Sequence, residues 1–124
     1  MSYLLVFLGG GLGAAFRHAV NQAAVALFGV AFPFGTLVVN VSGSAAMGVL
    51  TGWLAARAGI PAQVSLFLTT GFLGGFTTFS AFSFDAAAIW ERGDHTLALG
   101  YVAASVLLSI GGLFLGWAAV RAMT

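Results

Sequence analysis

The sequence predicts an all-α membrane protein, with four transmembrane helices forming a single domain over residues 1–124. Composition indicates this class: 60% of the residues are hydrophobic and 6% are charged, whereas soluble domains have about 25% charged residues. The placement of the charges indicates it too, because they separate long uncharged stretches. With four Arg, no Lys and a net charge of +1, the chain offers no basic face for nucleic acid. The absence of Cys excludes thiol chemistry.

Each predicted helix is an apolar stretch bounded by charges or by a turn signal. A helix needs about 20 apolar residues to cross the hydrocarbon core. Residues 18–56, 58–84 and 95–120 carry no Asp, Glu, Lys or Arg. The turn signal Phe32-Pro33-Phe34-Gly35 divides the first of these stretches. We therefore expect four helices, near 3–28, 36–56, 62–90 and 96–121.

The arginines leave the orientation of the chain in the membrane undecided. Arg57 and Arg121 fall on the side of the N-terminus, Arg92 falls on the opposite side, and Arg17 lies in the far half of the first helix. This count of two against two gives no preference, because Lys and Arg near the ends of the spans set orientation. Two interpretations stay open: a fixed orientation with a weak signal, and dual topology with antiparallel pairing of oppositely inserted copies.

The third predicted helix contains a stretch that disfavours regular helix. Gly74 and Gly75 precede a run rich in Thr, Ser and Phe at 76–83. Gly costs about 1 kcal/mol in a helix interior, and Ser and Thr compete for backbone hydrogen bonds. Unwound backbone at membrane depth is tolerated inside protein or beside water, and broken helices place carbonyls at ion sites. We expect a break here; the alternative is an unbroken helix with a glycine packing notch.

Polar side chains recur at every fourth residue on two predicted helices. They are Thr36, Asn40 and Ser44 on the second helix, and Tyr101, Ser105 and Ser109 on the fourth. Such groups need partners in the membrane, so each stripe faces protein or water rather than lipid. The stripes either bond neighbouring helices together or line a pathway. Neutral donors and aromatic ring edges suit a small hard anion, although hydroxyl oxygens can also coordinate a cation.

Arg17 lies within the first predicted helix. An arginine at the centre of the bilayer costs about 2.5–3.5 kcal/mol on insertion scales. Arg17 therefore either reaches a vestibule, where it would attract anions, or anchors a helix end at the interface. Asp85 is expected near the far end of the third helix.

Three stretches of the sequence resemble the CrcB/Fluc fluoride channels. They are residues 10–17 (GGLGAAFR), 35–44 (GTLVVNVSGS) and 71–82 (GFLGGFTTFSAF). The resemblance covers nearly the whole chain, and the third stretch is its most specific part. It implies an antiparallel, dual-topology homodimer in the lipid of the bacterial cytoplasmic (inner) membrane. Its two pores would passively export fluoride and so lower fluoride toxicity.

The resemblance also implies roles for individual residues. The fluoride pore would be lined by Phe79, Phe82, Asn40, Thr78, Ser80, Tyr101, Ser105 and Ser109. Arg17 would be the basic vestibule residue. The backbone carbonyls of Gly74 and Thr77 would hold a structural sodium ion at the dimer interface. Asp85 stands where family members often have the longer Glu.

The chief alternative is a small dual-topology, proton-coupled multidrug antiporter, which also has four helices. Its chemistry requires a carboxylate embedded in the membrane, whereas the first helix has none and Asp85 is expected near a helix end. An enzyme would need a buried nucleophile beside a base. His95 falls just before the fourth predicted helix and His18 directly follows Arg17, and both are expected at the membrane interface rather than in a catalytic pair. The sequence therefore predicts a fluoride channel rather than an antiporter or an enzyme.

Overall fold

The computed structural model describes residues 1–124, and all its regular structure is helical. Four spans are long and apolar enough to cross a membrane: α1 (Ser2–Phe28), α2 (Phe34–Ala55), a composite third span (Ala62–Glu91) and α6 (His95–Met123). The third span comprises α3 (Ala62–Leu66), the π-helical segment η1 (Phe67–Leu73), α4 (Gly74–Phe76) and α5 (Phe79–Glu91). The four predicted spans are confirmed, with ends that differ by at most two residues from those expected.

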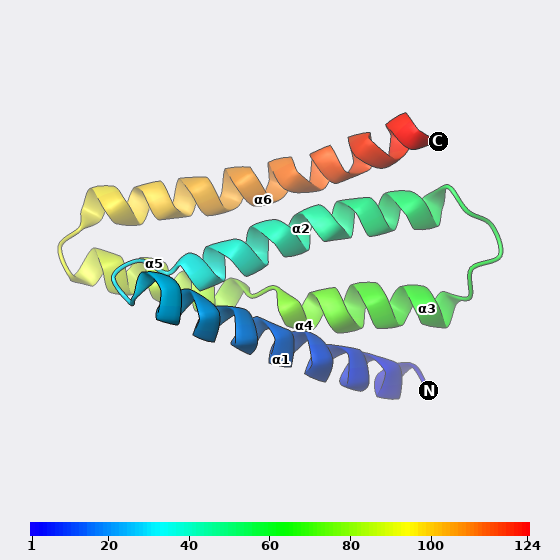
Figure 1. The fold of residues 1–124 in the computed structure, drawn as a ribbon, viewed down its shortest axis with the longest axis horizontal. Coiled ribbons are helices and arrows are strands. Elements are labelled where there is room, and N and C mark those ends of the chain that lie inside the picture. The colour runs from blue at the N-terminus through cyan, green and yellow to red at the C-terminus, as the bar shows by residue number, and fades with distance from the viewer.

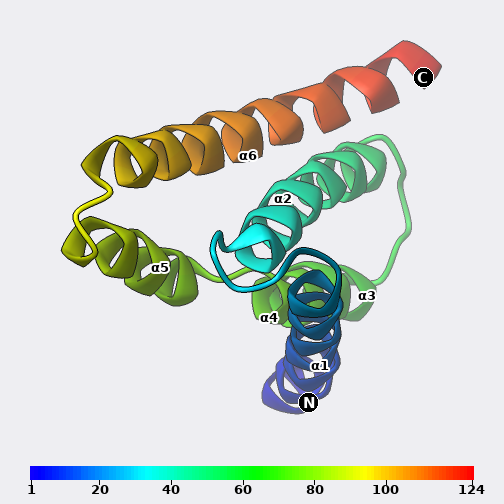
Figure 2. The same ribbon diagram turned by 60° about the vertical axis from the view of Figure 1, so that its left-hand side comes forward.

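The spans run lengthwise beside one another, and both termini lie at the same end of the molecule (Figure 1). Helices α2 and α6 pack together along their length, while α1 crosses the first half of the third span at η1 and α4. Figure 2 shows that α5 diverges from α3 and α4 and lies beside the first half of α6. The two halves of the third span therefore have different neighbours.

Glycine allows the closest backbone approaches between helices. A Cβ atom on Gly13 of α1 would collide with the carbonyl oxygen of Phe72 in η1. A Cβ atom on Gly48 of α2 would collide in the same way with the carbonyl oxygen of Leu113 in α6. Small residues at such crossings let backbones pack closely, and this packing drives helix association in lipid.

The third span bends where two residues leave the helical conformation. Thr77 (φ −86°, ψ 158°) and Thr78 (φ −152°, ψ 120°) are extended, and α5 begins at Phe79. The predicted break is thus confirmed as a bend, which lies at the threonines that follow the glycine pair. Gly74 and Gly75 remain helical. Gly75 serves packing instead, because a Cβ atom there would collide with the carbonyl oxygen of Gly10.

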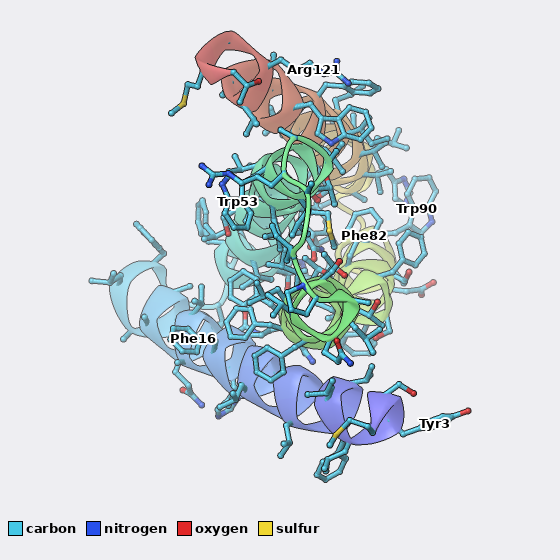
Figure 3. All side chains as sticks on the ribbon, turned by 90° about the vertical axis from the view of Figure 1, so that its right-hand side faces the viewer. Tyr3, Phe16, Trp53, Phe82, Trp90 and Arg121 are labelled. Carbon is cyan, nitrogen blue, oxygen red and sulfur yellow. The ribbon has the colours of Figure 1, made fainter.

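Most large apolar side chains point outward. Phe7, Leu107 and Leu115 are 75%, 70% and 72% exposed, as expected for helices that face lipid or another copy of the chain. Figure 3 shows Tyr3 projecting away from α1, whereas Phe82 lies inside the bundle. Tyr101 of α6 and Val39 of α2 are the largest fully buried side chains.

Candidate functional site

A groove of about 390 Å³ lies over the bend, between α2, α5 and α6. Its lining comprises Asn40 and Ser44 of α2, Thr77 and Thr78 at the bend, Phe79 and Phe82 of α5, and Ser105, Val106, Ser109 and Ile110 of α6. Two members of each polar stripe seen in the sequence therefore meet in one groove at the bend, whereas Thr36 and Tyr101 lie outside its lining. No charged side chain lines it.

Asn40 holds the backbone of the bend in place. Its Nδ2 atom donates to the carbonyl oxygen of Thr78 at 2.9 Å, and its Oδ1 atom accepts the N–H of Thr78 at 2.7 Å. The side chain thus supplies hydrogen bonds that the extended backbone cannot make within a helix. An amide group carries two N–H donors, so one remains for a ligand or water in the groove.

The threonine hydroxyls stabilise the two helix ends that meet at the bend. The Oγ1 atom of Thr78 accepts the N–H of Ala81 at 3.1 Å and caps the first turn of α5. The same atom lies 3.3 Å from the Oγ of Ser80, which is exposed and outside the groove lining. The Oγ1 atom of Thr77 donates to the carbonyl oxygen of Leu73 at 2.9 Å.

The bend deprives two carbonyl groups of their usual helical partners. In a continuous helix the N–H of Thr78 would donate to Gly74, but here it donates to Asn40. Similarly, the N–H of Ala81 would donate to Thr77 but donates to the hydroxyl of Thr78. Carbonyl oxygens of unwound membrane helices coordinate Na⁺ in other proteins. The carbonyls of Gly74 and Thr77 are therefore suitable oxygen ligands for a hard cation.

Ser105 and Ser109 contribute hydroxyl groups that have no partner within the chain. The Oγ atoms of both residues are buried and make no hydrogen bond. Leaving a buried polar group without a partner costs about 1–3 kcal/mol. Because both residues line the groove, an ion or a water molecule there could accept hydrogen bonds from these hydroxyls.

Two phenylalanine rings from α5 share the apolar part of the groove with Val106 and Ile110 of α6. Phe79 and Phe82 pack edge to face, with ring centroids 5.4 Å apart. Phe82 is 7% exposed, whereas Phe79 is 77% exposed. The edge of an aromatic ring carries partial positive charge. Phe82 is therefore a fixed wall, and Phe79 is available to whatever covers the groove.

Tyr101 lies one turn before Ser105 on α6 but does not line the groove. It is 1% exposed, and its hydroxyl donates to Oδ2 of Asp85 at 3.2 Å. Its ring centroid lies 5.3 Å from that of Phe82. Tyr101 therefore lies at the end of the groove, one turn from Ser105, and its hydroxyl is hydrogen-bonded to the Asp85 carboxylate.

Arg17 reaches the bend from α1. Its Nε atom donates to the carbonyl oxygen of Gly75 at 3.1 Å, and the side chain is half-buried. A cation beside the final carbonyls of a helix is stabilised by the partial negative charge there. Of the two roles considered for Arg17, this contact disfavours the helix-end anchor, because it keeps the guanidinium beside α4 and away from either end of α1.

Comparisons with known proteins are consistent with these features. A family model described as "CrcB-like protein, Camphor Resistance (CrcB)" matches residues 4–117. The "Fluoride-specific ion channel FluC" of Rhodopseudomonas palustris (strain BisB5) is 56% identical over 124 residues, covering all of both chains. The "Fluoride-specific ion channel FluC 2" of Nitrobacter hamburgensis is 55% identical over the same full length. The "Fluoride-specific ion channel FluC" of Methylobacterium nodulans is 52% identical, and the match covers 98% of this chain and 97% of that relative. This chain therefore belongs to the CrcB-like family.

Proposed function

We propose that this chain is a fluoride-specific ion channel of the cytoplasmic membrane, which lets fluoride leave the cell passively. Full-length similarity to relatives named as fluoride-specific channels supports the proposal. The structural observation that carries it is the uncharged groove with unpartnered hydroxyls. A strongly hydrated anion must exchange its water for donors already in place, yet bind weakly enough to leave. Hydroxyls, an amide and ring edges meet both requirements without a fixed positive charge in the groove.

The proposed path follows the groove along α5 and α6. Fluoride would pass the rings of Phe79 and Phe82 and accept hydrogen bonds from Asn40 and from the hydroxyls of Thr78, Ser105 and Ser109. The Ser80 hydroxyl, outside the groove lining, would contribute from its place beside the Thr78 hydroxyl. Tyr101 would lie at the end of the path. Arg17, beside the bend, would raise the local anion concentration. The chain performs no covalent chemistry in this function.

We also propose that two copies pair antiparallel, with dual topology. Phe79 is 77% exposed at the groove, and a path for an ion through the membrane must be covered by protein rather than lipid. A second copy would supply the missing wall of each of two pores. The similar numbers of arginines on the two sides support insertion in both orientations.

The carbonyls of Gly74 and Thr77 would hold a structural sodium ion where the two copies meet. When bound, the cation would offset the charge of fluoride ions passing nearby. Two contacts of this chain favour that role. Asn40 engages the N–H of Thr78, and the Thr78 hydroxyl engages the N–H of Ala81, so neither N–H occupies the proposed carbonyl ligands.

Fluoride release from liposomes tests the proposal. Purified protein is reconstituted into liposomes loaded with potassium fluoride, and a fluoride electrode follows release after valinomycin is added. A passive channel releases fluoride without a pH gradient, whereas protein-free liposomes retain it. No release would contradict the proposal. Release of a cationic drug that requires a pH gradient would favour the antiporter alternative.

A further inference from the structure

Phe32, in the loop between α1 and α2, packs directly on Tyr101. The two ring centroids are 5.4 Å apart and the ring planes meet at 87°, an edge-to-face contact. Tyr101 also contacts Phe82, with a centroid distance of 5.3 Å, and its hydroxyl donates to Asp85. Tyr101 is thus held between a loop residue and the wall of the groove, and it is 1% exposed.

The loop that carries Phe32 is itself fastened at two points. The Nη2 atom of Arg92, just after α5, donates to the carbonyl oxygen of Ala31 at 3.2 Å. The ring of Phe34 packs on Phe32 at 4.8 Å and on Phe28 at 4.9 Å. These contacts connect the loop to the ends of α1 and α5 and so restrict movement of Phe32 away from Tyr101.

We propose that Phe32 is a positioning residue of the fluoride path, which acts by fixing the ring of Tyr101. The inference rests on the proposed channel function. Phe32 does not line the groove, so any effect on the ion must pass through another residue. Aromatic pairs have preferred geometry, and a tyrosine hydroxyl is located by the orientation of its ring. Without Phe32 the ring keeps only its contact with Phe82 and the hydrogen bond of its hydroxyl to Asp85, so the hydroxyl is held less precisely at the end of the Ser105 and Ser109 row.

Comparison with Phe28 separates this role from simple anchoring of the loop. Phe28 lies at the end of α1 next to the same loop, but its ring contact is with Phe34 and not with Tyr101. Phe28→Ala therefore removes a ring of the same size near the same loop and leaves the Tyr101 contact in place, because the Phe34 contact with Phe32 and the Arg92 hydrogen bond to Ala31 remain. A general loosening of the loop would affect both variants. The proposed role affects Phe32→Ala alone.

A double-mutant cycle measures whether Phe32 acts through the Tyr101 hydroxyl. The wild type, Phe32→Ala, Tyr101→Phe and the double variant are reconstituted, and fluoride release is measured over a range of fluoride concentrations. Packed neighbours commonly couple strongly. We expect Phe32→Ala to slow release by about tenfold in the wild-type background and to have no further effect in Tyr101→Phe. Phe32→Tyr should retain the ring contact and the wild-type rate, as should Phe28→Ala.

The other outcomes would overturn either the role of Phe32 or the proposed channel function. Equal slowing by Phe32→Ala in both backgrounds would overturn the inference, as would a Tyr101→Phe variant that conducts like the wild type. Phe32→Leu provides the same test if Phe32→Ala yields no folded protein, because it keeps an apolar side chain but loses the ring edge. A wild type that releases no fluoride would overturn the proposed function itself, and the two failures are thereby distinguished.

Discussion

Single side chains at the bend satisfy polar groups that a continuous helix would satisfy by itself. Asn40 bonds both backbone groups of Thr78, and Arg17 bonds the carbonyl of Gly75. From the sequence, an asparagine inside a membrane helix could be predicted to need several partners. The identity of the partner could not be predicted, because it depends on how α2 packs against the bend, 38 residues away in the chain.

Removing the Ser105 and Ser109 hydroxyls should impair conduction without weakening the fold. Both oxygen atoms are buried and unpartnered. The double substitution Ser105→Ala and Ser109→Ala therefore breaks no hydrogen bond within the chain, and it removes the free-energy cost of burying two unpaired hydroxyls. We expect an apparent melting temperature equal to or above that of the wild type, with fluoride release slowed at least tenfold. Thermal unfolding in detergent and the fluoride electrode measure the two quantities. Wild-type release would show that these hydroxyls do not serve the ion.

Removing the Asn40 amide should harm both stability and conduction. Asn40→Ala leaves the N–H and the carbonyl of Thr78 without partners, at a cost of about 1–3 kcal/mol for each buried group. We expect a lower melting temperature and loss of fluoride release. The matched control is Ser42→Ala, also on α2, because the Ser42 hydroxyl donates only to the carbonyl of Val38 in its own helix. Equal melting temperatures for the two variants would contradict the proposed clamp.

At the scale of helices, the sequence predicted the four spans and a bend in the third, but not which residues of that stretch would leave the helix. Long apolar stretches bounded by charges identify membrane spans because the bilayer imposes one length and one polarity. The position of the bend depends on tertiary contacts instead. Gly75 stays helical and packs against Gly10, whereas Thr78 is extended where Asn40 bonds both of its backbone groups. Intrinsic helix propensity and the competing hydroxyls indicated the whole stretch from the glycine pair to the Ser/Thr run, and neither depends on these tertiary contacts.

Two glycine substitutions should separate close packing from helix propensity. A Cβ atom on Gly48 would collide with the backbone of Leu113, whereas one on Gly111 would meet no atom within 4 Å. We therefore expect Gly48→Ala to separate α2 from α6 and to reduce the yield of monodisperse protein sharply. Gly111→Ala should fold normally. Size-exclusion chromatography of both variants measures this, and normal behaviour of Gly48→Ala would contradict the observed packing.

At the scale of the whole molecule, the positions of the arginines bear on the orientation of the chain in the membrane. Arg57 stacks on Trp53 and Arg121 on Trp117, with the guanidinium carbon 5.2 Å and 5.5 Å from the respective ring centroids, near the ends of α2 and α6. Arg92 lies at the opposite end of the bundle. Because Arg17 lies beside the bend, the two surfaces differ by one arginine, which is a weak signal under the positive-inside rule.

Shifting this balance should shift the orientation. Wild-type chains fused at the C-terminus to a fluorescent protein or to alkaline phosphatase should show both activities, because each reporter works on one side of the membrane. Replacing Arg57 and Arg121 by Gln leaves Arg92 as the dominant loop charge and should favour the phosphatase. Fluoride release should then fall, because antiparallel pairs need both orientations. A wild type that is active with one reporter only would contradict dual topology.

In the proposed channel, neutral donors and ring edges conduct fluoride and exclude chloride. The most direct test is simultaneous release of two anions from liposomes loaded with equal fluoride and chloride, followed by two ion-selective electrodes after valinomycin is added. A groove with pre-placed donors for a small hard anion should release the fluoride while the chloride stays inside. Equal release of both anions would contradict the proposed selectivity, and release of neither would contradict the proposed channel function.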